Sequence, residues 1–485
     1  MKSELVFVPL AGWGHLVPAI EFAKLVLNRD ENISISVLIM KLPLEFGVQN
    51  FIQSLTSQPR LKFIDVSLDE KTSSGFLSNL ETFLYDFIDG HKSNVREYVQ
   101  NISCSGFILD MFCTSMIDIA NELNVPSYIF FSSNAAFLGL CLHFENLRKE
   151  QNLDTSKYIN SNEELSILGF KNPCPTKVLP KHLLDSRLAS STLFLDGIRR
   201  FKETKAIIIN TFFELESFCL QALLDSKIVP KIYPVGPIIS FNENGNGRNS
   251  ISEAKIIINW LDEQPDSSVV FLCFGSMGSF EAEQIKEIAT ALEHCGHRFL
   301  WSLRRSPPKG KFDMPSDYKN YEEVLPEGFL ERTKEIGKII GWAPQVAILS
   351  HPSIGGFVSH CGWNSILESV HFGVPIATWP LYAEQQMNAF LLVKELGLGE
   401  EIKMDYVISF QGKNNQVDIV SADEIECGLL RLMRKSEENE VRKKIKGMKE
   451  KSRVAMEEGG SSHNSLGCLI KDVLTHLPQE ELCKD

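Results

Sequence analysis

Short apolar runs alternate with longer segments of helical spacing along most of this chain. Several of the runs are apolar throughout, which is typical of strands covered on both faces. In the first half they are Leu5–Leu10, Ser34–Met40, Lys62–Val66, Gly106–Asp110, Ser127–Phe131 and Ala206–Asn210. Segments with helical spacing, such as Leu16–Asn28 and Thr114–Leu123, lie between them. The alternation predicts a βαβ series and therefore a parallel, doubly wound α/β sheet.

A polar interruption separates this series from a second one. Residues 242–250 are rich in Asn and Gly and contain almost nothing apolar, as in an exposed linker. The later strand-like runs are Val269–Gly275, Arg298–Leu303, Lys338–Gly341, Ile354–His360 and Pro375–Pro380. We therefore predict two similar α/β domains, 1–240 and 253–459, joined by a linker over 241–252. A helix within 460–485 is expected to pack back on the first domain.

The composition excludes several classes of protein. The chain has 485 residues, of which 44% are hydrophobic and 23% charged, so it is neither mostly disordered nor a coiled coil. Its net charge of −13 is the opposite of what a nucleic-acid binder needs. Its 11 cysteines are dispersed and include no Cys-x-x-Cys pair, which is typical of reduced thiols. No run approaches the roughly 18–20 apolar residues of a membrane span. We expect a cytoplasmic monomer with no nucleic-acid or membrane partner.

A glycine-rich turn follows the first predicted strand. Ligands of parallel α/β sheets gather beyond the carboxyl ends of the strands, and Gly12 and Gly14 would let one approach the backbone. A dinucleotide fingerprint needs a further glycine where the chain has Val17, so a nicotinamide-dependent oxidoreductase is only a weak alternative. His15 in this turn is a candidate catalytic residue, and a structural role is the alternative.

Asp110 closes the apolar strand Gly106–Asp110. It therefore faces the same edge of the sheet as His15. If the two strands are neighbours, Asp110 could hold one imidazole nitrogen while the other nitrogen accepts a proton from a substrate hydroxyl. The alternative is that Asp110 caps the helix beginning near Thr114.

The densest motif surrounds the strand Ile354–His360, which turns at Cys361 and Gly362 into a helix. Asn364 and Ser365 open this helix, so its free N–H groups form an anion site suited to a pyrophosphate.

Glu368 lies one helical turn beyond Asn364 on the same face and could accept hydrogen bonds from ribose hydroxyls. Trp342 offers a flat surface for a base, while Glu384 and Gln385 could bind sugar hydroxyls. For each residue alone a core or cap role is the simpler interpretation, but their joint arrangement at three strand ends favours a ligand site.

Aromatic residues follow the strands of the first domain. Phe112, Phe130, Phe131, Phe137 and Leu138 could line an apolar pocket for a flat molecule, with core packing as the equal alternative. The segment 145–200 is less regular and could line a substrate pocket or be a surface insertion.

No metal site is expected from the sequence. No Asp-x-Asp lies at a predicted strand end and no His-Glu-x-x-His occurs. The stretch from His294 to His297 is better interpreted as a polar helix end, because one thiol and a two-residue gap do not close a tetrahedral site.

The stretch from Trp342 to Gln385 resembles, in length and order, the C-terminal signature box of plant UDP-dependent glycosyltransferases of secondary metabolism. The turn at Gly14, the segment Leu109–Cys113 and the loop Phe274–Ser276 are similar to the same family. The resemblance implies a GT-B fold, in which two Rossmann-like domains face a cleft.

The resemblance also implies residue roles. His15 would be the general base and Asp110 its partner. The UDP-sugar would be bound by Trp342 and Ala343 at the uracil, Gln345 and Glu368 at the ribose, Ser276, His360, Asn364 and Ser365 at the phosphates, and Trp363, Glu384 and Gln385 at the sugar. Apart from the resemblance, we expect the acceptor to lie against Gly14, Phe112, Phe131, Phe137 and Tyr382.

The resulting hypothesis is an inverting glucosyl transfer from UDP-glucose to a small phenolic acceptor, without a cofactor or metal. The resemblance is nearest to enzymes that glucosylate flavonoids, stilbenes and simple phenols. A non-phenolic acceptor such as a terpenoid, an apocarotenoid or a hormone is an alternative. A non-catalytic nucleotide-sugar-binding protein is another, and the presence of both His15 and Asp110 speaks against it. The cysteines have no predicted chemical role.

Overall fold

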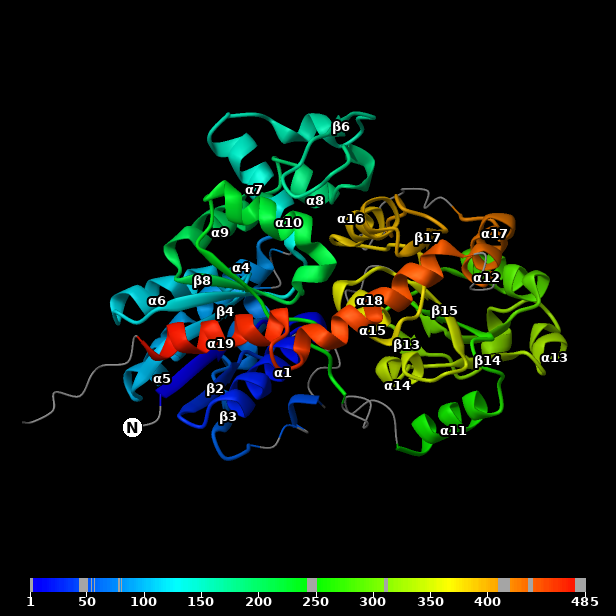
Figure 1. The fold of residues 1–485 in the computed structure, drawn as a ribbon, viewed down its shortest axis with the longest axis horizontal. Helices are drawn as coiled ribbons and strands as arrows, with labels where there is room; N and C mark the ends of the chain where they lie inside the picture. Colours follow the sequence, from blue (N-terminus) through cyan, green and yellow to red (C-terminus); the bar gives the residue numbers. More distant parts are fainter. Residues whose placement is uncertain are drawn as a thin grey trace, which may run out of the picture.

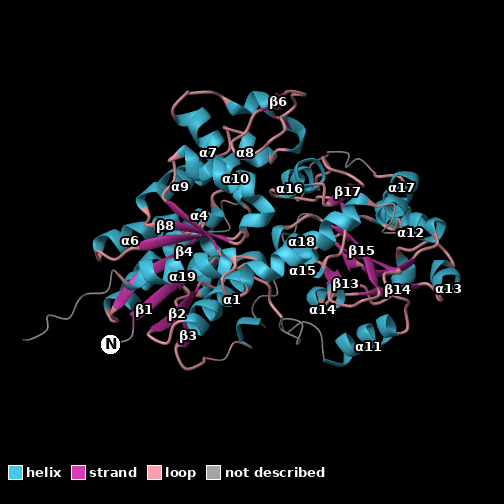
Figure 2. Ribbon diagram, in the orientation of Figure 1, coloured by secondary structure: helices cyan, strands magenta, loops and turns pink. Residues whose placement is uncertain are grey.

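The two large sheets of the computed structural model are parallel and separate, and each is flanked by helices (Figures 1 and 2). The structure describes residues 3–42, 51–53, 55, 57–76, 79, 81–241, 251–308, 313–408, 419–434 and 439–475.

The first sheet has seven parallel strands in the order β3-β2-β1-β4-β5-β8-β9. Their bounds are β1 (Ser3–Val8), β2 (Ile33–Ile39), β3 (Leu61–Asp65), β4 (Cys104–Asp110), β5 (Ser127–Phe131), β8 (Ala206–Ile209) and β9 (Lys231–Pro234). The chain order reverses between β1 and β4, and the carboxyl ends of such a strand pair form the usual ligand crevice of an open α/β sheet.

Helices cover both faces of this sheet (Figure 1). They include α1 (Trp13–Arg29), α4 (Phe83–Gly90), α5 (Lys92–Gln100), α6 (Ile117–Glu122), α7 (Ala135–Lys149), α9 (Ala189–Arg200) and α10 (Phe213–Ser226). The central strands are buried along their whole length, which explains why they read as continuous apolar runs.

The second sheet has six parallel strands in the order β14-β11-β10-β15-β16-β17. Their bounds are β10 (Val269–Cys273), β11 (Arg298–Ser302), β14 (Gly337–Ile340), β15 (Ile354–Ser359), β16 (Ile376–Thr378) and β17 (Gly399–Glu401). Here the chain order reverses between β10 and β15. The helices of this half are α11 (Ile251–Asp262), α12 (Ala282–Cys295), α13 (Phe329–Thr333), α14 (Gln345–Leu349), α15 (Trp363–Phe372), α16 (Gln385–Phe390) and α17 (Ala422–Leu432).

The irregular segment 145–200 is organised around Arg148 at the end of α7. Its guanidinium donates to the Thr155 hydroxyl at 2.7 Å, to the Ser191 hydroxyl at 2.9 Å and to the Leu183 carbonyl at 2.6 Å. One side chain therefore ties three turns of this segment to α7.

Several boundaries differ from the sequence-based expectation. The edge strands β9 and β17 were not predicted. Helix α1 begins at Trp13 instead of Leu16, because Gly12 has an extended backbone and its carbonyl accepts the Leu16 N–H at 2.8 Å. Of the predicted linker, residues 242–250 lie outside the described residues, and α11 begins at Ile251.

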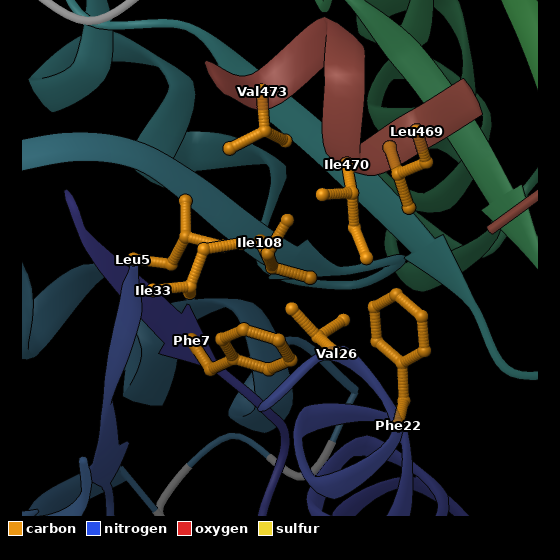
Figure 3. Close-up of a pocket in the computed structure, with 9 residues that line it drawn as sticks. All are labelled: Leu5, Phe7, Phe22, Val26, Ile33, Ile108, Leu469, Ile470 and Val473. Carbon is orange, nitrogen blue, oxygen red and sulfur yellow. The ribbon is translucent and has the colours of Figure 1, made fainter. Parts of the chain in front are cut away.

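The last helices run from the second half of the molecule back over the first. Helix α18 (Glu440–Met456) is followed by α19 (Ser461–Leu474), which contacts β9 and α1 (Figure 1). Helix α19 has an apolar stripe at the spacing of one helix face, consisting of Leu466, Leu469, Ile470 and Val473. Figure 3 shows three of these side chains above a small apolar cavity whose floor belongs to β1, β2, β4 and α1.

Shortening Ile470 to Ala is expected to loosen α19. Ile470 is 5% exposed and belongs to the apolar cluster of the first sheet, so the change should cost about 2–5 kcal/mol of packing free energy. Faster hydrogen exchange of α19 amides and a lower Tm would report it. Lys471→Ala, at an exposed position of the same helix, should change neither, and equal effects of the two variants would contradict the packing role.

No helix in the described part of the chain combines the length and the apolar character that crossing a membrane requires.

Candidate active site

His15 and Asp110 meet at the carboxyl end of the first sheet. Strands β1 and β4 are neighbours, so the helix turn after β1 and the last residue of β4 lie side by side. His15 Nδ1 is 2.8 Å from Asp110 Oδ2, and the Asp110 side chain is only 1% exposed. The other carboxylate oxygen accepts the N–H of Phe112 at 3.0 Å. The pair is thus fixed by the backbone, and the remaining ring nitrogen, Nε2, is available to a substrate.

The surroundings of His15 raise the pKa of its imidazole. Burial lowers this pKa, but the charge and hydrogen bond of Asp110, together with the charge of Glu384, outweigh burial and raise it above the usual 6.5. Because the side chain is still 23% exposed, a small molecule can reach the ring.

The loop after β5 brings polar groups to the same place, and sequence reasoning did not single them out. Ser132 Oγ lies 3.0 Å from His15 Nδ1, and the Ser133 hydroxyl donates to Glu384 at 3.1 Å. The available signal was their position, because they follow a buried strand at the carboxyl edge of the sheet.

The next residue of this loop joins the two halves of the molecule. Asn134 caps α7 through a 2.6 Å bond from the Phe137 N–H, and its amide donates to Asn388 at 2.6 Å. Asn388 in turn donates to the Cys361 carbonyl at 2.9 Å. Cys361 has a left-handed backbone (φ 62°), so Asn388 holds a strained turn between β15 and α15, and Asn134 of the other half bonds Asn388.

His360 begins this turn, and its ring lies between two glycines. A Cβ at Gly275 would lie 2.4 Å from the imidazole, and a Cβ at Gly362 would lie 2.5 Å from it, so only glycine leaves room for the ring. Burial lowers the pKa of His360 to about 4, which keeps it neutral, and its buried Nδ1 has no hydrogen-bond partner. Ser276, half-buried, follows in the loop after β10.

The first residues of α15 dock on the other half of the molecule. The Trp363 indole N–H donates to the Asn210 carbonyl at 2.6 Å, and the Asn364 amide donates to the Gly14 carbonyl at 3.2 Å. Trp363 is 3% exposed, so its ring is a structural contact between the halves.

Gln345, Ser365 and Glu368 form one hydrogen-bonded cluster. The Gln345 amide donates to the Ser365 hydroxyl at 2.8 Å and to Glu368 at 2.6 Å. Burial raises the pKa of Glu368 to about 7, although the Gln345 bond opposes the shift. The cluster joins the first turn of α14 to Ser365 and Glu368 of α15.

Trp342 lies beyond the end of β14, next to the buried Ala343. The Arg304 guanidinium is 5.2 Å from the centroid of the Trp342 ring, and the Trp13 ring is 5.8 Å from it. Arg304, which follows β11, was not identified from the sequence.

Gln385 holds the turn in which Glu384 lies. Its side-chain oxygen accepts the N–H groups of Leu381 at 2.9 Å and Tyr382 at 3.0 Å, so this oxygen is engaged within the turn. Burial raises the pKa of Tyr382 to about 12, and its ring centroid is 6.3 Å from that of His360.

An aromatic chain leads away from His15. The Phe112 ring lies 5.5 Å from His15 and 5.4 Å from Phe194, which stacks on Phe137 at 6.2 Å. Phe112 also borders a pocket between α4 and α9 that is open to solvent.

Two aromatics of the predicted pocket belong to the core instead. Phe131 has no exposed surface and packs against Phe201, and Phe130 points to the opposite face of the sheet, where it stacks on Phe22. Alternation along β5 separates them.

The described residues contain no cluster of three His, Cys, Asp or Glu side chains that could hold a metal ion. His294 lies at the end of α12, which closes on Gly296 with a left-handed backbone (φ 64°), as the polar helix-end interpretation predicted.

This chain is similar to known proteins both in sequence and in structure. The family described as "UDP-glucoronosyl and UDP-glucosyl transferase" matches residues 222–425. UDP-glycosyltransferase 71E1 of Stevia rebaudiana is 50% identical over 480 residues, with 97% of this chain and 98% of that protein covered. UDP-glucose flavonoid 3-O-glucosyltransferase 6 of Fragaria ananassa is 49% identical over 486 residues, with 98% and 99% covered. The crystal structure of Medicago truncatula UGT71G1 complexed with UDP-glucose superposes with a TM-score of 0.85 at 43% identity, covering 97% of this chain and 98% of that one.

The two parallel sheets, with polar groups gathered at their carboxyl edges, define a GT-B glycosyltransferase that uses a UDP-sugar. Within that class the chain belongs to the plant family 1 UDP-glycosyltransferases.

Proposed function

We propose that the protein is an inverting O-glucosyltransferase that moves glucose from UDP-glucose to a hydroxyl of a small phenolic acceptor. The observation that carries the proposal is the buried Asp110 carboxylate, 2.8 Å from His15, at the point where the two halves meet. The flavonoid named for the Fragaria relative and the UDP-glucose of the Medicago structure support the acceptor and donor classes.

His15 acts as the general base in this proposal. Asp110 holds the proton on Nδ1, so Nε2 keeps a lone pair and takes the proton of the acceptor hydroxyl. The acceptor oxygen then forms a bond to the anomeric carbon as the bond from that carbon to the UDP oxygen breaks. A single displacement inverts the centre, so an α-linked donor gives a β-glucoside.

The donor is held by the second half of the molecule. Trp342 stacks on uracil beside Ala343, and the cluster of Gln345 and Glu368 binds the ribose hydroxyls. Because the Gln385 oxygen and the Trp363 indole are already engaged, Gln385 binds the sugar through its NH2 group and Trp363 through its backbone. Glu384 accepts a further sugar hydroxyl.

Charge on the departing UDP is stabilised by donors that surround the first turn of α15. The free N–H groups of this helix and the side chains of Ser276, His360, Asn364 and Ser365 all face the diphosphate in the proposal. The acceptor lies against Gly14, Phe112, Phe137 and Tyr382, with Phe131 supporting Phe137 from the core.

A panel of phenols and non-phenolic alcohols, incubated with UDP-glucose, tests the function. We expect phenolic β-glucosides as the main products and no loss of activity with EDTA. Glucosides of terpenoid alcohols alone would overturn the acceptor class, and loss of activity with EDTA would overturn the stabilisation of UDP by protein donors.

Proton release on donor binding tests the role of Glu368. Its pKa is about 7 in the free protein, so near pH 7 the group is about half protonated. Ribose hydroxyls donate to the carboxylate and lower this pKa, so UDP-glucose should release up to about half a proton and bind more weakly as the pH falls below 7. Calorimetry in buffers of different ionisation enthalpy measures the release. The Glu368→Gln variant should show none, and equal release by both proteins would contradict the assignment.

A further inference from the structure

Pro18 lies inside α1, one turn beyond His15. Proline has no N–H, so the carbonyl of Gly14 has no partner within the helix, and the proline ring pushes that carbonyl away from the helix axis. A proline inside a helix is unfavourable for stability, so its presence calls for a compensating contact.

The carbonyl that Pro18 leaves free is used by the other half of the molecule. Asn364, in the first turn of α15, donates its side-chain N–H to the Gly14 oxygen at 3.2 Å. A Cβ at Gly14 would lie 4.0 Å from the Asn364 nitrogen, an ordinary contact distance, so this bond does not depend on glycine at that position.

This bond decides which way the Asn364 amide faces. Only the NH2 end of an amide can face a carbonyl, and that end carries two hydrogens. One hydrogen is donated to Gly14, and the other remains for a second acceptor. The Asn364 side-chain oxygen is buried and has no hydrogen-bond partner among the described residues. The orientation of the amide is therefore set by the bond from its NH2 group to Gly14.

We propose that Pro18 is a positioning residue for donor binding. By freeing the Gly14 carbonyl, it fixes the Asn364 amide with its second N–H directed at the donor diphosphate. Pro18 itself contacts no substrate. The inference rests on the proposed function, in which the first turn of α15 binds the diphosphate.

The bond from Asn364 to Gly14 connects the proposed UDP-sugar site with the proposed base. Gly14 precedes His15 in the first turn of α1, and Asn364 follows Trp363, whose indole binds the Asn210 carbonyl at 2.6 Å. Two adjacent side chains of α15 therefore hold backbone carbonyls of the other half, one of them next to the base.

The Pro18→Ala variant tests the proposal. The substitution restores a backbone N–H that bonds the Gly14 carbonyl within α1 and draws it back toward the helix axis. We expect the Kd for UDP, measured by calorimetry, to rise about threefold to tenfold, which is the loss of one positioned hydrogen bond. The Tm should stay the same or rise, because a proline has left a helix interior. Weaker UDP binding without lower stability distinguishes positioning from a structural role.

Two further variants make the test specific. Val17→Ala, the neighbouring partly buried residue of α1, adds no N–H and should leave the Kd for UDP unchanged. In an Asn364→Ala background, Pro18→Ala should have no further effect on UDP binding. An unchanged Kd in Pro18→Ala, or an equal rise in both backgrounds, would overturn the proposal. Absence of UDP binding in the wild type would overturn the proposed function and this inference with it.

Discussion

Replacing His15 with Ala is expected to lower kcat/KM for a weakly acidic phenol by about a hundredfold to ten-thousandfold. The variant loses the only ring nitrogen that Asp110 directs toward the acceptor in the proposed mechanism. The Kd for UDP should not change, because the nucleotide is proposed to lie against α15 and Trp342. Initial rates with UDP-glucose and a series of phenols of rising acidity measure the effect.

The acidity series makes this result specific. A more acidic phenol needs less help in losing its proton, so the loss in His15→Ala should shrink along the series. Full activity with the least acidic phenol, or the same loss with every phenol, would contradict a general-base role.

The Asp110→Asn variant is expected to lose about a hundredfold to ten-thousandfold in kcat/KM as well, because an amide no longer enforces a proton on Nδ1. It should also change the pH profile. Only neutral His15 can act as a base, so the rate falls as the pH drops below its pKa. Burial lowers that pKa and Asp110 raises it, so removing the carboxylate charge should move the acid limb to lower pH.

The pH dependence of kcat/KM in wild type and Asp110→Asn measures this shift. The Ser132→Ala variant is a useful comparison, because Ser132 Oγ is near the same ring nitrogen but carries no charge. We expect its acid limb to stay close to that of the wild type. An acid limb that stays in place in Asp110→Asn would show that the titrating group is not His15.

Much of the fold could be predicted because buried parallel strands are apolar along their whole length. Strand β5 has the bounds that the pattern gave. The edge strands escaped detection for physical reasons. Strand β9 ends in Pro234, which an edge position tolerates, and β17 is three residues long and includes Glu400 and Glu401.

The same reasoning extends to part of the site. His15 comes after β1 and Asp110 ends β4. Because the carboxyl ends of parallel strands lie at the same edge of a doubly wound sheet, the sequence is enough to place both residues at that edge. Contacts between the halves are a different matter, because they depend on how two separately folded sheets meet. The bond from Trp363 to Asn210 and the one from Ser133 to Glu384 leave no local pattern in the sequence.

The partners of individual side chains near the site also could not be predicted from local sequence patterns. Phe131 lies beside Phe130 in β5 but faces the opposite side of the sheet, and only the packed structure shows which rings each of them contacts. The Gln385 oxygen is taken by the turn of its own chain, which depends on the backbone at Leu381 and Tyr382.

The configuration of the product is the sharpest test of single displacement with His15 as the base. The purified protein, incubated with UDP-glucose and a flavonol, should yield UDP and a flavonol O-glucoside. The coupling of its anomeric proton in a proton NMR spectrum distinguishes the two anomers. We expect the β-glucoside from an α-linked donor. An α-glucoside would contradict single displacement with His15 as base, and free glucose without glucoside would contradict transfer to a phenolic hydroxyl.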